Sequence, residues 1–190
     1  MTTAHEARRE ERPKLSLYAF DRPALKGFSA ELKAALLADD RKALATMLGL
    51  GAGLAEKLAT GPRAVDWFLR PDGDPEASAL FASLRRVAKK RALEKAWTSD
   101  EPSLEGRLRN FDLLREDPKV AGLIDKLLDS ERLPWYLVRP GGTGGWLDEA
   151  KRLELARAMR GLLPALPKEL SGFARALADM DGAVIAHDAL

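Results

Sequence analysis

The strongest constraint on the fold is a series of short amphipathic segments, each preceded by an aspartate that can cap a helix. Asp21, Asp117 and Asp148 precede three of these segments, and Pro23 and Pro118 fall in the first turn of two of them. An aspartate side chain accepts hydrogen bonds from the first N–H groups of a helix, and proline is tolerated there because its missing N–H would have no helical partner. The sequence therefore predicts a mostly helical chain.

Within these segments the apolar residues recur at intervals of three, four and seven, which places them on one face of a helix. The stripe of Leu25, Phe28, Leu32 and Leu36 is an example, and packing into a core is its expected role. The predicted helices cover about 22–38, a segment from Asp39 or Asp40 to Gly49, a short piece over 54–59, and the segments 75–97, 104–114, 118–128, 149–163 and 167–181. Residues 61–75 are predicted to form an irregular connection, because they contain three prolines and two glycines.

Three short segments favour strands instead. LSLYAF (15–20) is short and contains aromatic residues, and AVIAH (183–187) is an apolar run close to the C-terminus. Residues 133–139 are aromatic and β-branched at their centre, which lies between Pro134 and Pro140. We therefore predict a helix-dominated α+β fold, with a small sheet of two or three short strands near residues 17, 137 and 185.

Length and composition predict one globular domain over 14–190, preceded by a mobile polar tail over 1–13. The 31 Lys and Arg residues nearly balance the 29 Asp and Glu residues, so the chain lacks the overall charge excess typical of nucleic-acid or membrane binding. It contains no cysteine and no apolar run long enough to span a membrane. We expect a soluble, cytoplasmic protein that does not bind membranes.

A glycine-rich stretch between Pro140 and Trp146 raises three interpretations. Neither common phosphate-binding glycine motif is present, and Asp148 with Glu149 puts negative charge where a phosphate would lie. The stretch is then either a connector pinned by inward-packing aromatic residues or a recognition element for another protein. The candidate partner-binding residues are Trp135, Tyr136, Arg139, Thr143 and Trp146.

A second candidate surface is RRVAKKR, in which Arg85, Arg86, Lys89 and Lys90 are predicted to share one side of a helix. A solvated charged face is the simplest interpretation, and binding to nucleic acid or to an acidic protein is the alternative. There is no interleaved aromatic row for base stacking, so we expect any nucleic-acid binding to be weak and nonspecific.

Catalytic residues are not evident. The two histidines, His5 and His187, lie near the ends of the chain and have no metal-ligand spacing, and no serine lies in a nucleophile-elbow motif. Carboxylate pairs such as Asp148 with Glu149, or Asp179 with Asp181, are left open as acid–base groups. We expect no cofactor and no metal, and an enzyme is the less favoured alternative.

The Ala-, Leu- and Arg-rich helical body, the LSLYAF opening and the WYLVRPGG segment resemble small bacterial proteins that include immunity proteins of contact-dependent toxin systems. The resemblance implies a stoichiometric binder that blocks a toxin and has no chemistry of its own. It contains no diagnostic motif, so it assigns no residue a role. The alternatives it leaves open are an enzyme and a nucleic-acid accessory protein that uses the basic helix face.

Overall fold

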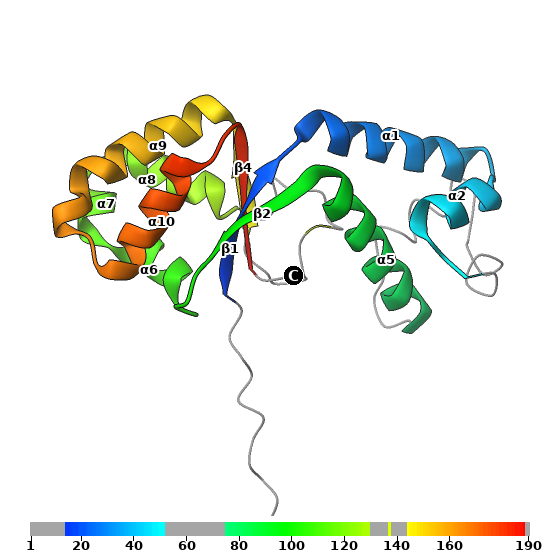
Figure 1. The fold of residues 1–190 in the computed structure, drawn as a ribbon, viewed down its shortest axis with the longest axis horizontal. Coiled ribbons are helices and arrows are strands. Elements are labelled where there is room, and N and C mark those ends of the chain that lie inside the picture. The colour runs from blue at the N-terminus through cyan, green and yellow to red at the C-terminus, as the bar shows by residue number, and fades with distance from the viewer. Residues whose placement is uncertain (1–13, 52–74, 130–136, 138–143, 189–190) are drawn as a thin grey trace, which may run out of the picture.

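The computed structural model describes residues 14–51, 75–129, 137 and 144–188. Figure 1 shows a narrow sheet at the middle of the molecule, with one group of helices on each side. The elements in chain order are β1 (Leu15–Phe20), α1 (Arg22–Leu37), α2 (Arg41–Leu48), α5 (Pro75–Ala92), β2 (Leu93–Thr98), α6 (Leu104–Asn110), α7 (Asp112–Arg115), α8 (Pro118–Leu127), β3 (Gly144–Leu147), α9 (Glu149–Leu162), the 3-10 turn η3 (Leu163–Ala165), α10 (Lys168–Asp179) and β4 (Ala183–Asp188). The predicted helix-dominated α+β class is confirmed.

The sheet is antiparallel throughout and has the strand order β2-β1-β4-β3. The two strands closest to the ends of the chain, β1 and β4, are the inner pair, so the sheet joins segments that are far apart in sequence. Strand β2 flanks β1 and β3 flanks β4. This arrangement confirms the strands predicted at 15–20 and 183–187 and adds two strands that the sequence did not predict.

Local signals placed several helix ends correctly. The Asp21 side chain accepts a hydrogen bond from the Ala24 N–H at 2.9 Å, and Asp40 caps α2 through the Ala43 N–H at the same distance. Helix α2 ends at Gly49, whose φ of 62° lies in the left-handed region that favours glycine.

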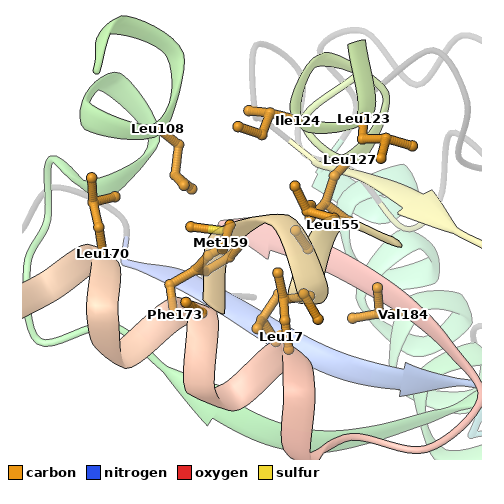
Figure 2. Close-up of a cluster of buried hydrophobic side chains, with 14 of the residues drawn as sticks. Leu17, Leu108, Leu123, Ile124, Leu127, Leu155, Met159, Leu170, Phe173 and Val184 are labelled. Atoms are coloured by element: carbon orange, nitrogen blue, oxygen red, sulfur yellow. The ribbon is translucent and has the colours of Figure 1, made fainter. Parts of the chain in front are cut away.

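Alternation along the strands separates two apolar clusters, one on each face of the sheet. Leu17 and Val184 point into a core with α6 to α10, whereas Phe20 and Ile185 point into a core with α1, α2 and α5. Figure 2 shows part of the first core, where Phe173 lies below Met159 and beside Leu17. Full burial of side chains of this size contributes roughly 1.5–3 kcal/mol each.

The connection before β4 is held by a buried charge. Arg152, on α9, is 2% exposed, and its guanidinium donates hydrogen bonds to the main-chain oxygens of Gly182 at 2.8 Å and Leu177 at 2.6 Å. Leu177 lies in the last turn of α10, where unpaired carbonyls carry partial negative charge. Arg152 therefore ties α9 to the end of α10 and the start of β4.

The helix predicted over 75–97 was wrong in its last turn and a half. Helix α5 ends at Ala92, and residues 93–98 form β2, which pairs with β1 and contains a bulge opposite Leu17 and Tyr18. LEKAWT is rich in helix-forming residues, but strand pairing and the contact of Trp97 with Phe173, whose ring centroids are 6.0 Å apart, favour the extended form. The long-range contacts override the local preference.

The C-terminal end of the glycine-rich stretch is a strand, whereas the sequence predicted a connector there. Gly144, Gly145 and Trp146 belong to β3, and Asp148 then caps α9 through the Lys151 N–H at 2.9 Å. A Cβ on Gly145 would lie 2.4 Å from the main-chain oxygen of Lys126 and 2.8 Å from that of Leu127. Gly145 thus permits a close approach between β3 and the end of α8.

The remaining helix predictions have mixed outcomes. The single helix predicted over 104–114 is divided into α6 and α7 at Phe111, whose backbone is extended. The predicted tail over 1–13, the helical piece over 54–59 and the connection up to residue 74 lie outside the described residues, as does the strand predicted at 133–139 except for Leu137, which is buried. Among the described helices, none is both long and apolar enough to cross a membrane.

Candidate binding surface

The cations predicted to share one face of α5 point in different directions. Arg86 is exposed, and its guanidinium lies near the C-terminal end of α2, where a Cβ on Gly49 would be 3.6 Å from Arg86 Nη2. Lys90 is also exposed and lines a hollow together with Asp21, Glu94 and other residues. These two residues therefore lie beside a helix C-terminus and near carboxylates, both of which suit a positive charge.

Arg85 and Lys89, one helical turn apart, are instead partly buried. The Lys89 Nζ lies 5.8 Å from the centroid of the Tyr18 ring on β1. Lys95, which is exposed on β2, is paired with Tyr18 across the strands. We call Arg85, Lys89 and Lys95 the basic cluster; it combines one turn of α5 with the edge of the sheet.

Buried hydroxyl groups lie on the strands next to the basic cluster. Ser16 Oγ and Thr98 Oγ1 lie 2.9 Å apart, across the β1 and β2 pair. Ser16 and Tyr18 are two residues apart on β1 and therefore share a face of the sheet. Their side chains are almost fully buried, with exposed fractions of 0% for Ser16 and 7% for Tyr18. The hydroxyls are therefore bonded to one another inside the protein, and the Tyr18 ring is the part of this group that contacts the basic cluster.

The basic cluster changes the acid–base behaviour of its members. Burial is the largest cause that lowers the pKa of Lys89 to about 8, and the positive charges of Arg85 and Lys95 lower it further. Burial raises the pKa of Tyr18, against a smaller opposite effect of its hydrogen bond with Ser16. At neutral pH Lys89 is thus a charged group in a place that disfavours its charge.

Four of the five predicted partner-binding residues lie outside the described residues; these are Trp135, Tyr136, Arg139 and Thr143. Trp146 is described, and its side chain is partly buried against the core that contains Phe20. The Trp146 and Phe20 rings meet edge to face with centroids 6.0 Å apart, and the Arg22 Cζ lies 4.7 Å from the Trp146 centroid. These contacts tie Trp146 to the start of α1, while its role in partner binding stays a prediction.

The candidates for catalysis are dispersed. His187 lies in β4, paired with Ser16 and Gly144. The Asp148 carboxylate caps α9 and is bonded to Lys151, and these hydrogen bonds lower its pKa. Within the described part of the chain no group of three or more His, Asp or Glu side chains gathers in a way that could hold a metal ion.

Comparison of the chain with protein-family models, with curated proteins and with solved structures finds no match. The geometry of the described residues is therefore the basis for a functional assignment.

Sequence reasoning identified Arg85 and Lys89 but missed Tyr18, Ser16 and Lys95. The alternation in LSLYAF did contain a signal, because Ser16 and Tyr18 alternate with the apolar residues Leu15 and Leu17. Lys95 had no such signal, since it was assigned to a helix and reaches the cluster only through the pairing of β2 with β1.

Proposed function

We propose that this chain is a protein-binding module that neutralises a cognate toxin by stoichiometric binding, and that an acidic surface of the toxin docks on the basic cluster. The observation that carries the proposal is the gathering of Arg85, Lys89 and Lys95 on one side of a chain whose net charge is only +2. Complementary charge is a common source of fast and selective protein association. The cytoplasmic location expected from the sequence is part of this proposal.

Repulsion within the cluster gives an acidic partner a clear advantage. Burial disfavours the charge on Lys89, and the neighbouring charges of Arg85 and Lys95 add to that cost. A partner carboxylate would offset both effects, because an opposite charge within a few ångströms favours the charged form of lysine.

The same geometry argues for protein over nucleic acid. Single-stranded nucleic acid is usually bound through aromatic rings on which bases stack. Tyr18 is the aromatic ring in contact with Lys89, and it is only 7% exposed. Its face is therefore not available to a base, so phosphate contacts alone would give weak, nonspecific binding.

The first experiment uses the product of a toxin-like gene next to the gene for this chain, purified separately. We expect one-to-one binding by calorimetry and loss of toxin activity at equimolar ratio. The double variant Arg85→Gln with Lys95→Gln should slow association at low salt by roughly tenfold, with the difference shrinking as salt is added.

The matched control is Arg86→Gln with Lys90→Gln, which removes the same charge from two exposed positions on α5, the helix of Arg85. We expect it to change the association rate far less. Equal effects of the two pairs would contradict docking on the basic cluster. A toxin-like neighbour that forms no complex, or a gene neighbourhood without one, would contradict the immunity function.

A further inference from the structure

We infer that Lys89 is the residue through which this chain recognises its partner, by binding a single carboxylate held on either side by Arg85 and Lys95. The inference rests on the proposed function and names the chemical group that the acidic partner must present. It also distinguishes Lys89 from the other cations of α5, which the sequence alone treats as equivalent.

Position is the first reason for choosing Lys89. It is the member of the basic cluster that neighbours both others, since Arg85 precedes it by one helical turn and Lys95 is paired with Tyr18, the ring that Lys89 contacts. Its ammonium group lies over the Tyr18 ring, which limits the directions from which a ligand can approach. A carboxylate that contacts Lys89 therefore also feels both flanking charges.

Partial burial is the second reason. A charge pair that is shielded from water is stronger than an exposed pair, because screening by solvent and salt is weaker there. Lys89 is partly buried whereas Lys90, its neighbour in sequence, is exposed. Removing Lys89 should then cost more binding than removing Lys90, although both changes delete one positive charge.

Proton linkage provides a signature that a merely structural lysine would lack. The groups that face Lys89 among the described residues are Arg85 on α5, Lys95 on β2 and Tyr18 on β1, and burial together with the two cations keeps its pKa near 8. A bound carboxylate raises this pKa, so binding above pH 8 takes up a proton. Affinity should consequently fall by about tenfold between pH 7.5 and 9.5.

The test uses a ten-residue polyglutamate peptide as the probe, at low salt, with the full chain. The pKa of Lys89 is followed by NMR of its Cε, and we expect a rise of at least about one unit with saturating peptide. Lys90 should shift much less. Lys89→Gln should weaken binding at pH 7 by roughly tenfold, Lys90→Gln by less than threefold, and Lys89→Arg should retain binding but lose the pH dependence. Thermal melting confirms that each variant is folded.

Three results would overturn the inference. The first is a Lys89 pKa that does not change at millimolar peptide. The second is an equal loss of peptide affinity in the Lys89→Gln and Lys90→Gln variants. The third is Lys89-dependent binding of a ten-nucleotide thymidine oligomer that is tighter than binding of the peptide. If the toxin-like neighbour still binds one-to-one and is insensitive to Lys89→Gln, the inference fails while the proposed function stands. If that neighbour does not bind but the peptide raises the Lys89 pKa, the proposed function fails and the carboxylate site stands.

Discussion

On one face of the sheet, helices α6 to α10 enclose a core of leucines with Phe173 and Met159. Among the described residues, the one charged side chain buried there is Arg152. On the other face lie α1, α2 and α5 (Figure 1), whose core includes Phe20 and Phe28. Cations lie at the margin of that core, as Arg91 does over the Phe28 ring. In the first region the buried charge has fixed main-chain partners. In the second, Lys89 is held beside other cations. The first arrangement favours stability, whereas the second disfavours the charge on Lys89, a cost that the proposed acidic partner would offset.

The largest expected effect comes from Gly145→Ala, which tests how tightly the first region is packed. The new Cβ would meet main-chain atoms of Lys126 and Leu127 at 2.4–2.8 Å, and backbone cannot move aside as a flexible side chain can. We expect a loss of about 3 kcal/mol of unfolding free energy, at the upper end of typical overpacking costs. Urea unfolding followed by circular dichroism measures it.

The control is Gly122→Ala on α8, the helix that Gly145 approaches. A Cβ at Gly122 would meet nothing within 4 Å apart from its chain neighbours and the backbone of its own helix, so alanine should add about 0.5–1 kcal/mol by its higher helix propensity. A Gly145 variant as stable as the wild type would show that β3 and α8 are not in close contact.

Sequence predicted the elements whose signals are local. Asp21, Asp40 and Asp148 each cap the helix that follows, so the helix starts could be read from nearby residues. The need for glycine at position 145 could not be predicted in the same way, because it comes from a contact with Lys126 and Leu127 of α8, 19 and 18 residues earlier in the chain. A glycine that provides space and one that provides flexibility look identical in sequence.

The candidate site was predictable to the same limited extent. Arg85 and Lys89 were found as a charged helical stripe, but their separation from Arg86 and Lys90 depends on which neighbours α5 meets. Lys95 was hidden because LEKAWT favours a helix locally and becomes a strand only when β1 is available for pairing. Register across the sheet, which no local pattern fixes, brings the basic cluster together.

The second prediction concerns Arg152→Met, which keeps most of the side-chain volume and removes the guanidinium. The main-chain oxygens of Gly182 and Leu177 would lose their donor, and the bond to Leu177 is fully buried. An unsatisfied buried acceptor costs about 1–3 kcal/mol, so we expect a net loss of about 2 kcal/mol after the gain of apolar packing. Arg157→Met, at an exposed position on the same helix, should stay within about 0.5 kcal/mol of wild type. If both variants unfold at the same urea concentration, Arg152 does not stabilise the first region.

The smallest expected effect concerns the second region. It is the change in the pH dependence of the unfolding free energy when Lys89 is replaced. Its pKa is about 8 in the folded chain, against the ordinary lysine value of 10.5 that applies to the unfolded chain. The unfolded state therefore binds more protons between these values, and the contribution of Lys89 to stability rises with pH across that window.

Attraction between Lys89 and the Tyr18 ring, worth about 0.5–1 kcal/mol at exposed sites, opposes the cost of its charge at neutral pH. Lys89→Gln should then differ from wild type by less than about 1 kcal/mol at pH 7, since solvent screens a partly exposed lysine. From pH 7.5 to 9.5 the wild type should gain stability relative to this variant, whereas Lys90→Gln should track the wild type. Urea unfolding at a series of pH values measures this difference. If the unfolding free energies of wild type and Lys89→Gln change with pH in the same way, Lys89 lies in an ordinary solvated position. The two regions would then not differ in the environment of their charged side chains.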